Sequence, residues 1–365
     1  MSKIKWPITG RIPYLDGLRA FSIALVVIGH SKPYIPFFKT RFAPLADSVL
    51  DGHFGVRVFF VLSGFLITTL LFGEEDKTGR ISITGFYERR IARIFPAFYL
   101  YILTLVVLTL LHSVDLHWPD FVTASTFLWN YQSLWTSPSA AASEILGHLW
   151  TLSLEEQFYL VWPATLILLG RKRGGQIAVG SILVFPVLRV ASYFLIPATR
   201  GQLMMMFHTG ADMIMWGAMA AYLCKDGILD RFKTLKFRGA IPWLCGFGVF
   251  VLRPVLEAKI RGAEVVITPT LECVCIVAFI FWLLSGEMGI VRRVLESWPM
   301  VQLGLLSYSL YLWQQLFILS EATQRFSIYL RILGALVAAV VSYRLVEIPS
   351  RAKIRGWFAQ SKPAH

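Results

Sequence analysis

The feature that most constrains this chain is a succession of long apolar segments along its 365 residues. A helix needs about 20 apolar residues to cross the hydrocarbon core of a bilayer. Only 16% of the residues are charged, which is too few for the water-exposed surface of a soluble domain. We therefore predict an all-α fold, a polytopic membrane helix bundle with about ten transmembrane helices. The predicted spans are 13–31, 53–72, 94–112, 148–170, 176–197, 204–223, 239–256, 266–284, 300–320 and 327–347.

The distribution of Lys and Arg predicts the orientation of these spans. With the N-terminus in the cytoplasm, the cytoplasmic segments contain 22 Lys and Arg residues and the exterior segments contain 8. The predicted exterior loop 113–147 contains none. Because cytoplasmic loops of membrane proteins are enriched in cations, we expect both termini in the cytoplasm and an even number of spans.

Composition also excludes several other classes of protein. The net charge is +13, but the cations lie mostly in short loops between apolar runs and no nucleic-acid-binding motif accompanies them, so we expect no nucleic acid partner. None of the four cysteines forms a CxxC motif, and we expect neither a metal site nor a structural disulfide. We interpret the first apolar segment as a retained helix, because it contains Arg19 and no cleavage site follows. Residues 1–365 are expected to form a single membrane domain without an appended soluble domain.

The segment 13–31 contains three residues that bear on function. Arg19 and His30 are eleven residues apart, so a helix places them on one side, about 16 Å apart along its axis. Asp16 precedes Arg19 by three residues and can pair with it. One interpretation is structural: Arg19 extends to the cytoplasmic interface and His30 ends the helix. The other is that both line a polar path, with His30 acting as a base near neutral pH.

Residues 14–30, which contain Arg19 and His30, resemble the opening motif of a known family, the integral membrane O-acyltransferases called acyltransferase-3. The family's opening motif has an Arg and a His separated by ten residues, as Arg19 and His30 are here. Further stretches resemble other parts of the family in the same order along the chain. The matching stretches are YLDGLRAFSIALVVIGH, GVRVFFVLSGFLIT, FYERRIARIFPAF, HLWTLSLEEQFYLVWP, SYSLYLWQ and YRLVEIPSR.

The chain also departs from the family pattern in two places. Many members carry a His-Trp-Pro-like step after SLYLW, where this chain has Gln314, Gln315 and Leu316. Many members also carry an Arg two residues before the Asp of the sixth helix, where this chain has Gly210 before Asp212. These differences concern the subfamily and its acceptor.

Three arginines stand where the predicted cytoplasmic loop enters the third helix. Arg89, Arg90 and Arg93 share roughly one helix face, and guanidinium groups bind phosphates through paired hydrogen bonds. A positive anchor that contacts anionic lipid is the alternative. Because the family uses acyl-CoA from the cytoplasm, the resemblance implies that these three residues bind the phosphates of an acyl-CoA co-substrate, expected to be acetyl-CoA.

The resemblance also singles out Glu155, two residues before the Gln of QFY. Glu155 would lie near the depth of His30, orient its imidazole and stabilise the protonated form. A salt bridge with Arg57 or Arg189 is the alternative. The roles of His53, Arg57, Asp212 and Glu272 are left open between substrate contact and ion pairing.

The resemblance thus implies a multi-pass enzyme of the bacterial inner (cytoplasmic) membrane, an O-acetyltransferase. It would move an acyl group from cytoplasmic acyl-CoA to a hydroxyl of a carbohydrate, such as a surface polysaccharide or its lipid-linked precursor. We predict catalytic roles for His30, Glu155 and Arg19 and donor binding by Arg89, Arg90 and Arg93. The alternative from another class is a secondary transporter, or a polysaccharide export component, that uses the intramembrane Arg, His and Asp groups as a relay. The oligomeric state and the acyl transfer route, direct or through an acyl-enzyme, are left open.

Overall fold

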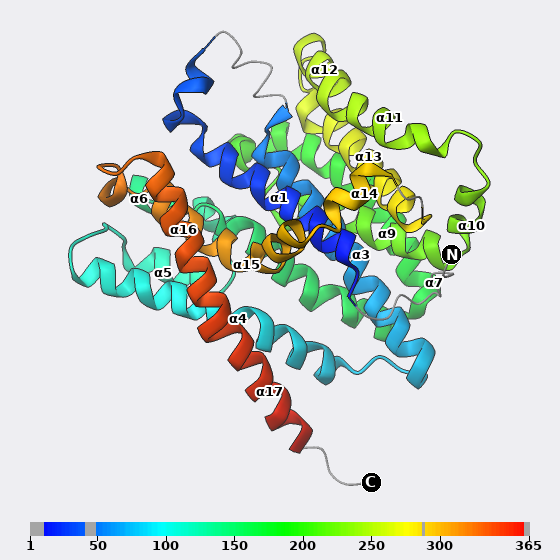
Figure 1. Ribbon diagram of the computed structural model, residues 1–365, viewed down its shortest axis with the longest axis horizontal. Coiled ribbons are helices and arrows are strands. Elements are labelled where there is room, and N and C mark those ends of the chain that lie inside the picture. Colours follow the sequence, from blue (N-terminus) through cyan, green and yellow to red (C-terminus); the bar gives the residue numbers. More distant parts are fainter. Residues whose placement is uncertain (1–10, 41–48, 287–288, 361–365) are drawn as a thin grey trace. The chain divides into compact units, whose positions relative to one another are not determined.

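In the computed structural model, residues 11–40, 49–286 and 289–360 are described. Every regular element within these ranges is a helix, which confirms the predicted fold class (Figure 1). The helices group into two compact units. The first unit contains Met1–Gly29, Pro36–Ile81 and Leu154–Leu305, and the second contains His30–Ile35, Ser82–Ser153 and Leu306–His365.

Six helical stretches among the described residues are long and apolar enough to cross a membrane. The chain therefore has the helices of a multi-pass membrane protein, and the number of about ten spans stays a prediction. The six stretches are Gly52–Thr78 (α3), Ile83–Leu110 (α4), Leu149–Leu195 (α7), Arg238–Lys259, Ile267–Leu284 (α13) and Ile328–Ile354. The fourth contains α11 (Ile241–Phe247), a π-helical turn (Gly248–Leu252) and α12 (Arg253–Lys259), and the sixth contains α16 (Ile328–Ser342), a second π-helical turn (Tyr343–Glu347) and the start of α17 (Ile348–Gln360).

The helix α7 covers two of the predicted spans. Its 47 residues would extend roughly 70 Å as one straight rod, more than twice the thickness of a hydrocarbon core. Gly170 interrupts the helical conformation, with φ 74° and ψ 169°. A side chain at this position would be strained, so glycine permits the break between the two segments.

The first unit is built around the contact between α3 and α9 (Asp212–Lys225). Gly64 of α3 lies against the carbonyl group of Ile214, and Gly217 of α9 lies against that of Val61. A Cβ on either glycine would overlap the facing backbone, so the two helices approach as closely as small residues allow. Gly64 and Gly217 are therefore close-contact positions of this helix pair.

One predicted span, 204–223, has a different form from the one expected. The segment 204–223 is a short helix, α8 (Phe207–Gly210), followed after Ala211 by α9. The buried guanidinium of Arg189 binds the Thr209 carbonyl at this break, which satisfies the irregular backbone. The predicted spans 13–31 and 300–320 are helices α1 (Pro13–Ser31) and α15 (Trp298–Ile318), which are not among the six stretches named above.

In the second unit, α4 packs against α17 and the adjoining π-helical turn (Figure 1). The Tyr308 hydroxyl, on α15, donates a hydrogen bond to the Ile94 carbonyl of α4 at 2.8 Å. Short helices occupy the predicted exterior segment: α5 (Trp118–Ser125), a 3-10 turn (Trp129–Leu134) and α6 (Ala140–Ile145). This unit therefore joins the arginine-bearing helix α4 to the second half of α15.

Candidate functional site

The imidazole of His30 lies beside two consecutive glutamines of α15. Its Nδ1 is 2.8 Å from Oε1 of Gln314, whose side chain is fully buried. Its Nε2 is 3.4 Å from Nε2 of Gln315. All three residues belong to the second unit. The two ring nitrogens of His30 therefore each face a glutamine amide.

The orientation of the Gln315 amide follows from the neighbouring histidine. The backbone N–H of His148 donates to Oε1 of Gln315 at 3.0 Å, and Nδ1 of the same histidine lies 2.7 Å from this oxygen. A backbone N–H is only a donor, so the atom that it meets must be the amide oxygen. The amide nitrogen of Gln315 consequently faces His30.

This orientation determines which nitrogen of His30 carries the proton. The Gln315 amide nitrogen is a donor, so Nε2 of His30 presents a lone pair to it. The proton of the neutral ring is then on Nδ1 and is donated to Oε1 of Gln314. Because the Gln315 contact is long, a substrate hydroxyl is able to replace it and give its proton to Nε2.

A buried shell of polar and aromatic side chains holds the glutamine pair in place. The Tyr311 hydroxyl donates to the His148 carbonyl at 2.9 Å, and the Thr151 hydroxyl donates to the Tyr311 oxygen at 2.6 Å. The ring of Tyr101 meets those of His148 and Trp313 edge to face, at centroid distances of 5.8 and 5.4 Å. These contacts restrict the side chains whose orientation sets the tautomer of His30.

The three predicted donor-binding arginines are on α4, in the same unit as His30. The guanidinium of Arg90 lies over the Phe86 ring at 5.6 Å, and Arg89 is exposed. Arg93 is half-buried and precedes Tyr101 by eight residues, so roughly 12 Å of α4 separates the arginine cluster from the aromatic shell around His148. The same helix thus carries the three arginines and Tyr101, one residue of that shell.

A buried carboxylate adjoins the arginine cluster. Glu347 is fully buried in the π-helical turn, accepts a hydrogen bond from the Ser309 hydroxyl and pairs with Arg351 at 2.5 Å. Arg93 acts electrostatically on the same carboxylate. π-helical turns often mark functional positions, and this one directs a carboxylate into the helix packing.

Arg19 and Glu155 belong to the first unit. Arg19 forms the predicted ion pair with Asp16 at 3.6 Å, and Asp16 also pairs with Arg11 at 2.6 Å. Glu155 accepts a hydrogen bond of 2.5 Å from the Ser63 hydroxyl of α3. Both predicted site residues are therefore held by polar partners within their own unit.

Three intramembrane residues whose roles the sequence left open, Arg57, Asp212 and Glu272, form ion pairs. Arg57 pairs with Glu272, and Arg189 pairs with Asp212 at 2.5 Å. Arg253 joins Glu272 at 2.8 Å and also pairs with Asp51. Buried charges at membrane depth are expected to be paired in this way.

Asp51, which directly precedes α3, is a carboxylate of this network outside the predicted spans. Burial raises the pKa of its carboxyl, but Arg253, His53 and Arg57 together outweigh burial and hold the pKa below its ordinary value of 3.8. Asp51 also caps α3 by accepting the backbone N–H of His53 at 2.9 Å. The carboxylate therefore stabilises this end of the helix in its charged form.

Sequence reasoning missed the residues that determine the state of His30. Gln314 and Gln315 were noted only as departures from the family pattern, and His148 was assigned no role. Two adjacent glutamines within an apolar run were the available signal, because buried amides require partners. Among the described residues, no group of three His, Cys, Asp or Glu side chains is arranged to hold a metal ion.

The fold and site together describe a multi-pass membrane protein with a histidine hydrogen-bonded to two buried glutamines. The chain matches the family model described as "Acyltransferase domain" over residues 12–344, and it belongs to this family, acyltransferase-3. The resemblance noted in the sequence is confirmed.

Relatives of known name are O-acetyltransferases. The chain is 27% identical to the O-acetyltransferase OatA of Staphylococcus aureus over 94% of its own length and 57% of the relative. It is 26% identical to the peptidoglycan O-acetyltransferase OatA of Listeria monocytogenes over 93% of its length and 56% of the relative. The chain thus spans little more than half the length of these relatives. No solved structure matches it.

Proposed function

We propose that this chain is a membrane O-acetyltransferase that moves an acetyl group from acyl-CoA to a hydroxyl of a carbohydrate. Membership of the acyltransferase family and the names of the relatives support the reaction class. The word peptidoglycan in the name of the Listeria relative supports a glycan acceptor. The same comparisons favour acyl transfer over the transporter alternative.

The observation that carries the proposal is the hydrogen-bonded state of His30. With its proton held on Nδ1 by Gln314, the imidazole offers Nε2 to the acceptor hydroxyl. As Nε2 takes the proton, the hydroxyl oxygen forms a bond to the thioester carbonyl carbon. The C–S bond then breaks, and the departing CoA thiolate receives the proton from His30. The products are the acetyl ester of the carbohydrate and free CoA thiol, and His30 returns to its neutral state.

The donor side of the proposal rests on the arginines of α4. Arg89, Arg90 and Arg93 would bind the phosphates of CoA, because guanidinium groups suit phosphate geometry. The shared helix supports this role, since an extended thioester arm lying along α4 would lead from the cluster toward the level of Tyr101. Arg19, from the first unit, is proposed to stabilise charge along the donor's path.

Glu155 is also proposed as a catalytic residue, with Ser63 rather than His30 as its hydrogen-bond partner. Its hydrogen bond with Ser63 supports a carboxylate that is oriented by α3. In the second unit, the Nδ1 side of His30 is occupied by Gln314, so orientation of the imidazole is assigned to that glutamine. Glu155 is then proposed to act on charge that develops during transfer.

We propose the cytoplasmic membrane of a bacterium as the location, with both termini inside. The excess of Lys and Arg in the predicted cytoplasmic loops supports this orientation. It gives the arginine cluster access to cytoplasmic CoA and leaves the exterior face to the carbohydrate.

Acyl transfer by the purified protein tests the proposal. The protein in lipid nanodiscs is incubated with acetyl-CoA labelled in the acetyl group and with glycan fragments, and the release of CoA and labelled ester is followed. We expect His30→Ala to abolish both products and His117→Ala, at an exposed histidine of the same unit, to leave them unchanged. Movement of intact glycan without consumption of thioester would support the transporter instead.

A further inference from the structure

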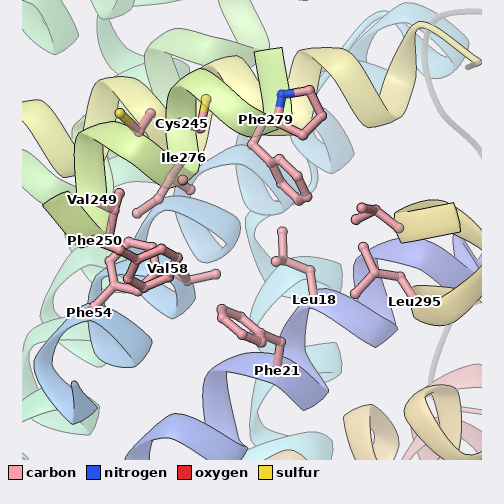
Figure 2. Close-up of a pocket in the computed structure, with 14 residues that line it drawn as sticks. Leu18, Phe21, Phe54, Val58, Cys245, Val249, Phe250, Ile276, Phe279 and Leu295 are labelled. Carbon is pink, nitrogen blue, oxygen red and sulfur yellow. The ribbon is translucent and has the colours of Figure 1, made fainter. Parts of the chain in front are cut away.

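The first unit contains an apolar cavity that the proposed reaction does not use. Its volume is about 240 Å³. Figure 2 shows side chains of α1, α3, α11 and α13 converging on one space, with Phe54 and Phe250 at one end and Leu295 of α14 (Ile290–Leu295) at the other. Among the residues that the structure describes, no charged, hydroxyl or amide side chain lines it. A polar ligand would find no hydrogen-bond partner among these side chains.

The surroundings of the cavity are those of a membrane interior. Three of its walls, α3, α13 and the helical stretch Arg238–Lys259, are among the stretches able to cross a bilayer. Leu244 and Phe247, next to lining positions on α11, are 65% and 57% exposed, as lipid-facing side chains are. The medium that meets this cavity is therefore lipid hydrocarbon.

The shape and size of the cavity fit a chain rather than a compact molecule. Lining residues run from Pro242 to Phe250, which is roughly 12 Å along the helix axis. An apolar cavity of about 150 Å³ holds one benzene molecule, so this volume accommodates about ten hydrocarbon carbons. A fatty acyl chain leaving the bilayer gains no hydrophobic free energy, but it restores the packing contacts that an empty cavity lacks.

Two exposed cations lie close in sequence to residues that line the cavity. Phe250 lies at the end formed with Phe54, and Leu295 lies at the other end. Pro242, eight residues before Phe250 on the same helical stretch, lies away from the Phe250 end. Lys236, six residues before Pro242, is exposed. Arg293, between the lining residues Val291 and Leu295, is exposed as well.

We propose that this cavity binds one fatty acyl chain of an anionic phospholipid whose phosphate lies against Lys236 and Arg293. Both segments belong to predicted cytoplasmic loops, where anionic headgroups are attracted by cations. The bound acyl chain would contact α1, α3, α11, α13 and α14 at once and so stabilise their packing. This site is independent of the acyl transfer proposed above.

Gly246 offers a direct way to fill the cavity. It lines the cavity, and a Cβ at this position would meet no heavy atom within 4 Å, so a larger side chain can enter the space without a backbone clash. Gly239 is a matched control, because it is exposed, lies outside the cavity lining and is equally open around its Cβ.

The experiment measures lipid retained by the full chain. The protein and its variants are taken from nanodiscs containing equal phosphatidylglycerol and phosphatidylcholine into mild detergent, and retained lipid is identified by native mass spectrometry. We expect one phosphatidylglycerol per chain, loss of this lipid in Gly246→Phe and Gly246→Leu, and full retention in Gly239→Phe. Lys236→Gln and Arg293→Gln should each lower the preference for phosphatidylglycerol about fivefold while some lipid remains.

A second measurement locates the bound acyl chain within the protein. Phosphatidylglycerol with a photoreactive group in its acyl chain should label peptides of α11 and α13, and this labelling should fall in Gly246→Leu. Equal retention in the Gly246 and Gly239 variants, equal affinity for the two phospholipids, or recovery of an isoprenoid lipid in place of phosphatidylglycerol would each overturn the proposal.

Discussion

The side chain of Gln314 is predicted to determine which nitrogen of His30 acts as the base. In Gln314→Leu, the Nδ1–H of His30 loses its acceptor at 2.8 Å. An unsatisfied buried donor costs about 1–3 kcal/mol, and the half-buried imidazole of His30 corresponds to the lower end of this range. The tautomer with Nε2 free to accept a proton therefore becomes roughly 5-fold less populated. We expect kcat to fall by this factor and the KM for acetyl-CoA to stay unchanged, because the donor-binding arginines are not altered.

The Gln314→Glu variant separates this role from simple packing. A carboxylate still accepts the Nδ1 proton, so activity should be largely retained at alkaline pH. The carboxylate also stabilises the protonated imidazole, which is inactive as a base, so the acid limb of the kcat profile should move to higher pH. His148, the other titratable group joined to this network, is unchanged in both variants.

The assay follows CoA release by the nanodisc-embedded protein across the pH range. Gln132→Leu is the matched control, since Gln132 is an equally buried glutamine of the same unit that donates to Asp120 at 2.6 Å. It should lower thermal stability without changing kcat. The reasoning is refuted if Gln314→Leu keeps the wild-type kcat, or if Gln314→Glu leaves the acid limb in place.

Three further predictions follow from other parts of the structure. Arg89→Gln should raise the KM for acetyl-CoA with kcat unchanged, because a phosphate contact binds ground state and transition state alike; equal donor saturation would contradict it. Gly64→Ala should destabilise the α3–α9 contact by about 1–3 kcal/mol, read as a lower unfolding temperature, whereas Gly180→Ala, with open space around its Cβ, should not. Asp51→Asn keeps a helix cap but loses the charge paired with Arg253. Because the pKa of Asp51 is lowered, the free energy that its charge adds to folding is present above pH 3.8 and is lost as the pH falls below this value. The unfolding temperature of the wild type should therefore exceed that of the variant above pH 3.8, and the difference should disappear at lower pH.

The intramembrane charges show which features of the site residue types alone can predict. Their presence identified Arg57, Asp212 and Glu272 as costly groups that need partners. The pairing of Arg57 with Glu272 and of Arg189 with Asp212 joins residues far apart in the chain. No spacing rule connects such positions, since helices far apart in sequence meet only through packing.

The sequence by itself determined the helical membrane class, the family and the helix positions of Arg19, His30 and the arginines of α4. The length of apolar segments, the distribution of cations and the local motifs are properties of contiguous stretches of sequence, so they can be identified without a structure. Only the tertiary structure decided that Gln314 and Gln315 flank His30 and that His148 orients Gln315. A hydrogen bond depends on the distance and direction between atoms, and across 284 residues of separation that geometry exists only after the helices have packed.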